Sequence, residues 1–214
     1  MERLNMRITV CTLQFGEVPF LRYSEAINRM YCNRYGYQFT VIRAPRQIQR
    51  SPIWFKVKGV ADLLVTSEFV LFLDADAYFI NQSRMVEQLI DEQMQGASFL
   101  IGTDRLNKHF AFSDENANCG VFLVRRTEHA THILQDWWNV PTSADKRWLW
   151  QWPPEQAAFN LVVRPRWGNE AIRVIPYFYM NGSDGTYIRH LMGFSNLERL
   201  HILRNEARRI CAGD

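Results

Sequence analysis

The stretch Phe69-Val70-Leu71-Phe72-Leu73-Asp74-Ala75-Asp76 runs five apolar residues directly into a pair of aspartates. An all-apolar run of this length is typical of a β-strand covered on both faces, as in a parallel sheet between layers of helices. In extended chain, the spacing of Asp74 and Asp76 turns both carboxylates toward the same side. Open parallel sheets bind their ligands beyond the carboxyl ends of the strands. The stretch therefore predicts two carboxylates in a crevice at the end of a central strand.

Asp74 and Asp76 are expected to lie close enough to repel each other unless a positive charge separates them. A divalent cation removes that repulsion, and Mg²⁺ or Mn²⁺ suits both carboxylate and phosphate oxygens. Such an ion would bridge the aspartates to a diphosphate and stabilise its charge as a leaving group. The alternative is purely structural: aspartate is common in turns, and the pair would then only cap the turn after the strand.

The segments around this strand alternate between strand and helix patterns. Five runs of β-branched and apolar residues are expected to be further strands: 7–12, 37–42, 99–102, 120–124 and 172–175. Apolar residues at helical spacing predict helices over 24–34, 54–65, 85–94, 128–139, 155–162 and 197–210. Ser24 is the expected N-cap of the first helix. This order predicts an α/β fold, a single Rossmann-like domain over residues 1–214 with a mostly parallel central sheet flanked by helices.

The composition limits the class of protein. A chain of 214 residues can bury a substantial core. The net charge of +3 suits an anionic ligand such as a nucleotide diphosphate, but it is too small to indicate nucleic acid. No apolar run is long enough to cross a bilayer and no signal core opens the chain, so a cytoplasmic location is expected. The cysteines form no C-x-x-C pair and are expected to be reduced thiols: Cys11, Cys32, Cys119 and Cys211.

Four further segments carry polar residues in a fixed order around the aspartates. They are Pro52-Ile53-Trp54-Phe55-Lys56, Asn118-Cys119-Gly120 with the apolar run after it, Trp152-Pro153-Pro154-Glu155-Gln156, and His190-Leu191-Met192-Gly193. In this order the segments resemble retaining glycosyltransferases of the GT-A fold, a family that includes plant xyloglucan xylosyltransferases and fungal galactosyl- and mannosyltransferases. The chain is also similar to chlorovirus enzymes that glycosylate capsid proteins, which would make the location the host cytoplasm.

The resemblance implies metal and donor contacts residue by residue. The metal ligands, for Mn²⁺ or Mg²⁺, would be Asp74, Asp76 and His190, whose imidazole is a common ligand. The donor would be contacted by Lys56, Asp74, Ala75, Asn118, Gly120 and Gly193. Lys56 would face the phosphates or hold the aspartates, and its alternative is a surface lysine. Gly120 would permit a close backbone approach or an unusual dihedral angle.

Glu155 and Gln156 match an acid-glutamine pair that lies near the reacting carbon in the family. The family more usually has aspartate at the first position, so the carboxylate of Glu155 reaches one methylene further. Its role therefore stays open between positioning the acceptor, acting as a base and binding sugar hydroxyls. Thr12 and Gln14 are assigned to the nucleotide pocket by position alone, because the first strand supplies that pocket in GT-A folds.

Trp148, Trp150 and Trp152 alternate along the chain just before Glu155. In an extended segment this spacing would put three indoles on one side, and aromatic faces stack well on sugar rings. The segment is thus a candidate wall for the acceptor, with core packing as the alternative. The arginines of the last helix are expected to form a solvated face: Arg199, Arg204, Arg208 and Arg209.

These features predict a metal-dependent transfer of a sugar from a nucleotide-diphosphate donor, a UDP-sugar, to a glycan acceptor with retention. Residues 1–115 would form the nucleotide-binding part, and residues 116–214 the acceptor and metal-closing part. A sugar nucleotidyltransferase or phosphohydrolase also uses two acids and a metal, but the P-loop motif is missing from the sequence. A non-catalytic sugar- or nucleotide-binding module fits the tryptophans, yet it has no need of the aspartate pair, the late histidine and the acid-glutamine pair together.

Overall fold

The computed structural model describes residues 6–45, 50–104, 116–141, 147–150 and 153–212. A six-stranded sheet with the order β2-β1-β3-β6-β5-β7 forms its centre. The strands are β1 (Ile8–Gln14), β2 (Gln38–Arg43), β3 (Phe69–Leu73), β5 (Phe99–Thr103), β6 (Ala117–Arg125) and β7 (Ile172–Ile175). β6 runs antiparallel to its neighbours β3 and β5, and the other neighbouring pairs are parallel. The predicted α/β fold with a mostly parallel sheet is confirmed.

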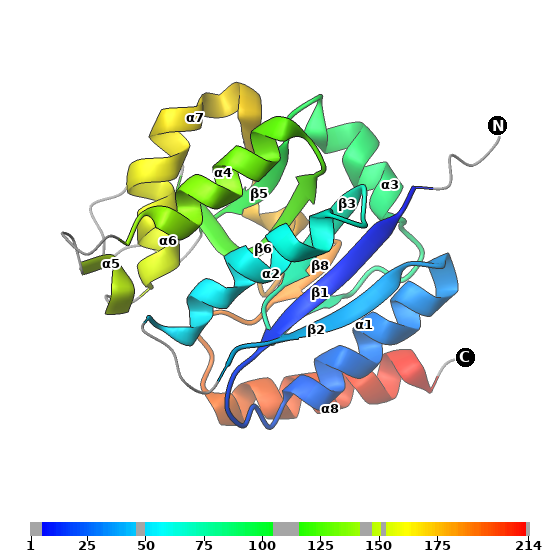
Figure 1. Cartoon of the computed structure of the whole chain (residues 1–214). Helices are drawn as coiled ribbons and strands as arrows, with labels where there is room; N and C mark the ends of the chain where they lie inside the picture. Colours follow the sequence, from blue (N-terminus) through cyan, green and yellow to red (C-terminus); the bar gives the residue numbers. More distant parts are fainter. Residues whose placement is uncertain (1–5, 46–49, 105–115, 142–146, 151–152, 213–214) are drawn as a thin grey trace.

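Helices cover both faces of this sheet (Figure 1). One face is covered by α2 (Phe55–Leu64), α4 (Glu128–Asn139), α6 (Pro154–Ala158) and the π-helical turn η3 (Phe159–Val163). The other is covered by α1 (Leu21–Tyr35), α3 (Val86–Leu89) and its π-helical continuation η2 (Ile90–Met94). The last helix, α8 (Asn196–Cys211), packs against α1. Shorter helical elements are η1 (Pro52–Trp54), α5 (Arg147–Trp150), α7 (Arg164–Ala171) and η4 (Tyr177–Tyr179).

The central strand β3 is buried along its whole length, which explains its unbroken apolar sequence. Val70 and Phe72 belong to the core beneath α2 and α4, whereas Phe69, Leu71 and Leu73 belong to the core beside α1. Successive side chains of a strand point to opposite faces, so a strand covered on both sides needs apolar residues at every position. β3 thus carries the two aspartates on a rigid, fully buried support.

A second, two-stranded sheet joins the segment just after β3 to one near the end of the chain. β4 (Ala77–Phe79) pairs antiparallel with β8 (Ile188–His190), and Ala77 lies opposite His190. Three-residue strands are too short to show an alternating pattern, so the sequence does not predict them. This pairing determines where His190 lies.

Ser24 is not the N-cap of the first helix, and that prediction is wrong. α1 begins earlier, at Leu21, and Ser24 is buried inside it. Its hydroxyl donates a hydrogen bond of 2.6 Å to the carbonyl oxygen of Ala75. Asn28, one turn further on, donates one of 3.0 Å to the carbonyl oxygen of Ala77. α1 therefore anchors the loop that follows β3.

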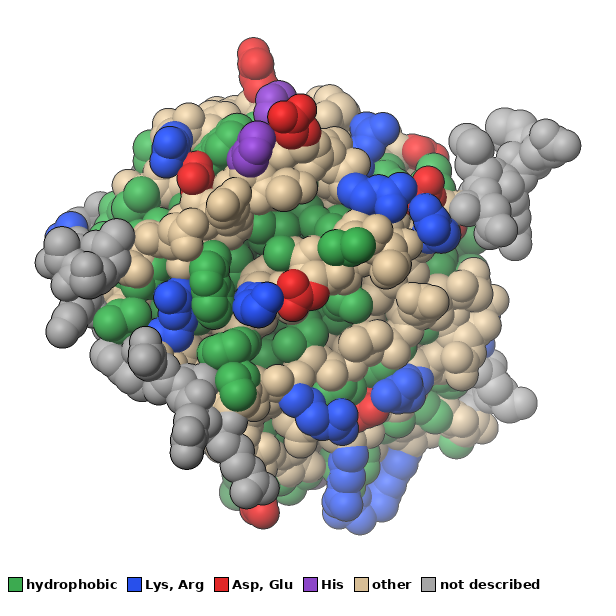
Figure 2. Space-filling model, viewed as in Figure 1, with side chains coloured by type: hydrophobic (Ala, Val, Ile, Leu, Met, Phe, Trp, Pro, Cys, Tyr) green, Lys and Arg blue, Asp and Glu red, His purple; other side chains and the backbone are tan. Residues whose placement is uncertain are grey.

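The surface carries charges of both signs, and the four cysteines form no disulfide. In the described part of the chain, no helix is both long and apolar enough to cross a membrane. On the face seen in Figure 2, lysine and arginine side chains lie in several separate groups among apolar and acidic ones. The cysteines are free thiols, as predicted, and burial raises the pKa of Cys11 and Cys119 above the usual value.

Candidate active site

A cavity of about 680 Å³ opens at the carboxyl-terminal edge of the sheet, beside the loop that follows β3. Sheets of this kind bind ligands beyond the carboxyl ends of their strands, so this is the expected place for a site. Apolar residues from the segment before α1 line one part of the cavity. Five carboxylates also line it: Glu17, Asp74, Asp76, Asp104 and Glu155.

The loop with the two aspartates is held by backbone hydrogen bonds to distant parts of the chain. The Asp74 N–H donates to the carbonyl oxygen of Gly120 at 2.6 Å, and the Leu191 N–H donates to that of Asp76 at 3.1 Å. Together with the bonds from α1, these contacts restrict the direction of both carboxylates. The side chain of Asp74 is 27% exposed and that of Asp76 only 9%.

The pairing of β4 with β8 brings His190 to both aspartates. Its Nε2 lies 3.3 Å from Asp76 Oδ1 and 3.7 Å from Asp74 Oδ2. The three residues offer one carboxylate oxygen each and one imidazole nitrogen, all within 4.8 Å of one another. Neighbouring ligands of an octahedral ion with bonds of about 2.1 Å are separated by roughly 3 Å, close to the observed spacings. Asp74, Asp76 and His190 therefore fit a divalent cation in both ligand type and spacing.

The carboxylate of Asp76 is stabilised by positively charged neighbours. Burial disfavours the ionised form of Asp76, yet His190 and Arg199 hold the pKa of that carboxyl below its usual range. Burial alone would lower the pKa of His190, but Asp76 and Asp74 raise it overall. A buried aspartate that stays ionised needs positive charge beside it, which a proton on the imidazole or a metal ion supplies.

Lys56 is buried beneath the cavity and joins two carboxylates. Its Nζ donates to Asp74 Oδ1 at 2.9 Å, to Glu155 Oε1 at 3.1 Å and to the carbonyl oxygen of Cys119 at 3.1 Å. Burial lowers the pKa of Lys56, but Asp74 and Glu155 outweigh it and raise that pKa above its usual value. Burial raises the pKa of Glu155, and Lys56 offsets this only in part. Lys56 is thus the residue that holds Asp74, rather than a surface lysine.

A family model described as nucleotide-diphospho-sugar transferase matches residues 46–201, most of the chain. The chain belongs to this family. No curated protein matches it with significant sequence similarity.

Solved structures with the GT-A fold resemble this nucleotide-diphospho-sugar transferase domain. A glycosyltransferase involved in glycosylation of the major capsid of PBCV-1 superposes with a TM-score of 0.73 at 19% identity, over 93% of this chain and 99% of that one. The galactosyltransferase LgtC, solved with donor and acceptor sugar analogues, superposes with a TM-score of 0.52 at 11% identity, over 95% of this chain and 96% of that one. The glycosyltransferase GlyE of Streptococcus pneumoniae TIGR4 superposes with a TM-score of 0.58 at 12% identity, over 98% of this chain and 64% of that one. At these identities the likeness establishes the fold.

Gly120 makes room for the imidazole ring of His190. A Cβ atom at position 120 would lie 2.0 Å from His190 Cε1 and 2.7 Å from its Nδ1. Gly120 does not have a positive φ, so an unusual dihedral angle is not the reason for glycine here. The close approach that the sequence suggests is made by the imidazole ring.

Gly120→Ala is therefore expected to displace His190 and weaken the affinity for Mn²⁺ by about 10- to 100-fold, as when a ligand loses its supporting contacts. Titration followed by electron paramagnetic resonance of free Mn²⁺ measures this affinity. In a His190→Ala background the same alanine should cause no further loss, because no imidazole remains to be displaced. An equal loss in both backgrounds would show that Gly120 acts in another way.

Several other predicted residues do meet at the cavity. Gln156 accepts a 2.9 Å hydrogen bond from the Cys119 N–H and donates one of 2.8 Å to Asp104 Oδ2. Asn118 accepts a 2.9 Å bond from the Gly120 N–H through its Oδ1. Both polar side chains are thereby fixed against β6. The predicted residues that line the cavity are Asp74, Ala75, Asp76, Asn118, Gly120, Glu155, Gln156, His190 and Gly193.

Thr12 and Gln14 do not line the cavity, and the side chains there belong to Leu13 and Phe15. Consecutive strand residues face opposite sides of the sheet, so Thr12 and Gln14 point away from the side to which Leu13 points. β1 is buried at six consecutive positions, Ile8 through Leu13, and its sequence therefore shows no alternation from which to choose. Thr12 is buried instead on the opposite face of the strand from the cavity.

The tryptophan segment is not extended where the structure describes it. Arg147–Trp150 forms one helical turn, α5, so this part of the segment lacks the extended backbone on which the predicted wall of indoles depends. Trp148 is buried in the main core, and its carbonyl oxygen accepts a 2.9 Å bond from Trp54 Nε1. Its predicted contact with the acceptor is replaced by core packing. Trp152 lies outside the described residues.

Arg199 and Asp104 are among the cavity residues that the sequence did not predict. Arg199, expected on a solvated face, lies in the first turn of α8, where its Nε donates to Asp76 Oδ2 at 2.8 Å. Asp104 lines the cavity at the end of β5 and binds Gln156. Position after a predicted strand was a signal for Asp104, whereas no local pattern separates Arg199 from the other arginines of its helix.

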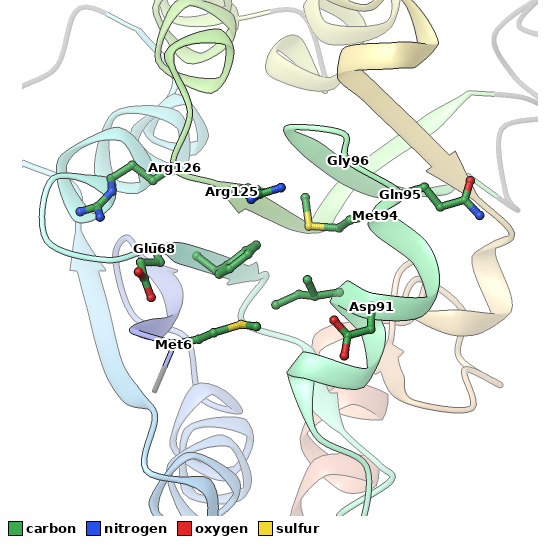
Figure 3. A pocket seen from close by; sticks show the side chains of 10 residues that line it. Met6, Glu68, Asp91, Met94, Gln95, Gly96, Arg125 and Arg126 are labelled. Carbon is green, nitrogen blue, oxygen red and sulfur yellow. The ribbon is translucent and has the colours of Figure 1, made fainter. Parts of the chain in front are cut away.

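A second cavity, of about 540 Å³, lies at the opposite edge of the sheet, next to the first residue of β3 (Figure 3). Figure 3 shows Arg125 and Met94 extending over the same hollow. Glu68 in its wall accepts a 2.9 Å bond from the Arg7 N–H, and the guanidinium of Arg125 lies 6.0 Å from the Phe69 ring centroid. It is separated from the aspartates by the length of the strand, and none of the predicted site residues lines it.

Proposed function

We propose that this protein is a metal-dependent glycosyltransferase that moves a sugar from a nucleotide-diphosphate donor, a UDP-sugar, to a carbohydrate acceptor with retention. The observation that carries the proposal is the cluster of Asp74, Asp76 and His190 at the cavity beyond β3. Membership of the nucleotide-diphospho-sugar transferase family supports sugar transfer over nucleotidyl transfer or simple binding. In this proposal, Asp74, Asp76 and His190 hold Mn²⁺ or Mg²⁺.

A divalent ion in that cluster supplies positive charge that stabilises the diphosphate as a leaving group. Lys56 directs the carboxylate of Asp74 toward the cluster through its 2.9 Å hydrogen bond. Gln156, Asn118 and Gly193 contact the donor in this proposal, from the cavity wall that they line. Because each of these groups is held by the fold, little reorganisation is needed when charge develops.

The transfer is proposed to follow a front-face route. The acceptor hydroxyl oxygen bonds to the anomeric carbon while the bond from that carbon to the diphosphate breaks. The diphosphate oxygen keeps the electron pair and takes the hydroxyl proton, so no protein base is required. A covalent route through Glu155 is the alternative, by analogy with retaining glycosidases.

Glu155 is proposed to bind the transferred sugar. Its Oε1 is held by Lys56 at 3.1 Å, and its Oε2 is buried without a hydrogen-bond partner among the described residues. A buried carboxylate oxygen that lines a cavity gains stability from a donor, and a sugar hydroxyl provides one. The acceptor is proposed to lie beside it, near Pro153.

With Mn²⁺ and a panel of nucleotide-sugars, the purified protein is expected to release free nucleoside diphosphate from one donor. Water can take the place of the acceptor slowly, so no acceptor is needed. A coupled assay for nucleoside diphosphate measures release, and EDTA should abolish it. Formation of nucleotide-sugar with pyrophosphate release would instead favour a nucleotidyltransferase. Absence of both release and metal-dependent nucleotide binding would contradict the proposal.

A further inference from the structure

Arg199 reaches into the cavity from the helix that closes the chain. A capping box of Ser195 and Glu198 secures the first turn of α8, in which Arg199 lies. Its Nε donates to Asp76 Oδ2 at 2.8 Å and to the carbonyl oxygen of Leu191 at 3.1 Å. Its guanidinium also lies 5.7 Å from the Phe20 ring centroid, so an aromatic face supports it. The side chain is therefore held in one place before any ligand binds.

The charges around the cavity single out this arginine. Among the described residues that line the cavity, Arg199 is the one lysine or arginine, against five carboxylates. Lys56 lies beneath the cavity and is shared between Asp74 and Glu155. A divalent ion is balanced by the two aspartates that would hold it. Arg199 then remains as the fixed cation facing an anionic donor.

The contacts of Arg199 leave part of its guanidinium available. Asp76 presents Oδ1 to His190 and Oδ2 to Arg199, so the histidine and the arginine use different oxygens of one carboxylate. Nη1 lies 3.4 Å from Asn196 Oδ1, and Nη2 has no hydrogen-bond partner among the described residues. A guanidinium presents a planar fork of donors that matches phosphate oxygens in pairs.

We propose that Arg199 is the residue that binds the diphosphate of the donor and selects nucleoside diphosphates over monophosphates. This inference rests on the proposed function. Arg199 stays on Asp76 through Nε and donates from its Nη atoms to the phosphate oxygens that gain charge as the sugar leaves. Arg199 donates hydrogen bonds only and gives up none of its own protons; the proton that the diphosphate takes comes from the acceptor hydroxyl.

The test compares Arg199→Ala and Arg199→Lys with wild type by isothermal titration calorimetry in Mn²⁺. The probes are UDP, GDP and ADP and the matching monophosphates, and Mn²⁺ alone is titrated by electron paramagnetic resonance. Arg204→Ala is the matched control, because it removes the same charge from an exposed position of the same helix. Thermal unfolding of each variant is recorded beside the titrations.

Arg199→Ala is expected to weaken the affinity for the nucleoside diphosphate that wild type binds by about 10- to 100-fold, the range of charge-assisted hydrogen bonds. Monophosphate affinity should change much less, Arg199→Lys should recover part of the loss, and Arg204→Ala should match wild type. Mn²⁺ alone should bind at least as tightly as in wild type, because a cation has been removed from Asp76. If Arg199 had a purely structural role, Arg199→Ala would instead weaken the affinity for Mn²⁺ in parallel with the affinities for the nucleotides.

Two results overturn the assignment in different ways. Unchanged diphosphate affinity in Arg199→Ala, or equal losses for diphosphate, monophosphate and Mn²⁺, would overturn the role of Arg199 while leaving the proposed function intact. Absence of metal-dependent nucleoside diphosphate binding by wild type would overturn the proposed function, and the role of Arg199 with it.

Discussion

Replacing Asp76 by asparagine is expected to lower metal-dependent release of nucleoside diphosphate on the order of 10³-fold, the effect of losing several kcal/mol of charge stabilisation. Asp76 Oδ1 lies 3.3 Å from His190 Nε2 at the centre of the proposed metal cluster. The side chain is 9% exposed, so water has little access to take its place as a ligand. Asparagine keeps the size but removes the charge. Steady-state rates with the donor identified for wild type measure the effect.

Asp62→Asn is the matched control for that experiment. Asp62 lies on the exposed side of α2, where its side chain is 64% exposed and pairs with Lys58. The same change of carboxylate to amide there should leave release unchanged. Wild-type rates in Asp76→Asn would mean that the aspartate pair is structural, and the transferase proposal would have to be abandoned.

Lys56→Met is expected to lower the free energy of unfolding by about 3–5 kcal/mol, the cost of breaking a buried ion pair by removing one partner. The side chains of Lys56 and Glu155 are 1% and 2% exposed, so water cannot replace the lost ammonium. Glu155 is then left as a buried carboxylate, and Asp74 loses the bond that directs it. Urea denaturation followed by tryptophan fluorescence measures the change.

A second variant separates this cause from a simple packing defect. Adding Glu155→Gln to Lys56→Met should recover part of the lost stability, because the unpaired buried charge is removed together with its partner. Lys58→Met is the control: its pair with Asp62 is exposed, and such pairs contribute at most about 1 kcal/mol. The interpretation fails if Lys56→Met costs no more than Lys58→Met.

The central strand and the two aspartates were predictable because their signal is local. Five apolar residues followed by Asp74 and Asp76 specify a buried strand and a polar loop without reference to the rest of the chain. The same holds for the helices, whose apolar residues recur at helical spacing. Capping was less predictable: Ser24 has the right residue type for a cap, but α1 begins at Leu21 and uses Ser24 to bind Ala75.

The assembly of the site was predicted only in part, and mainly through the family resemblance. His190 lies 114 positions after Asp76, and its sequence position does not indicate that the two residues meet. They are brought together by the pairing of β4 with β8, and strands this short show no recognisable sequence pattern. Gly120 was noted as a place of close approach, but the sequence does not say that His190 makes the approach. Lys56 was left open between facing the phosphates, holding the aspartates and lying on the surface; its burial excludes the surface role, and it contacts Asp74 and Glu155.

By itself, the sequence determined the α/β layering, the buried strand β3 and the position of the aspartates at its end, because hydrophobic periodicity acts over a few residues. Tertiary structure alone decided that Leu13 and Phe15 face the cavity, that Trp148 enters the core and that Arg199 reaches Asp76. A strand buried on both faces shows no alternation, and arginines along one helix look alike in sequence. Which of them meets a buried carboxylate depends on how the elements pack, because that contact joins residues far apart in the chain.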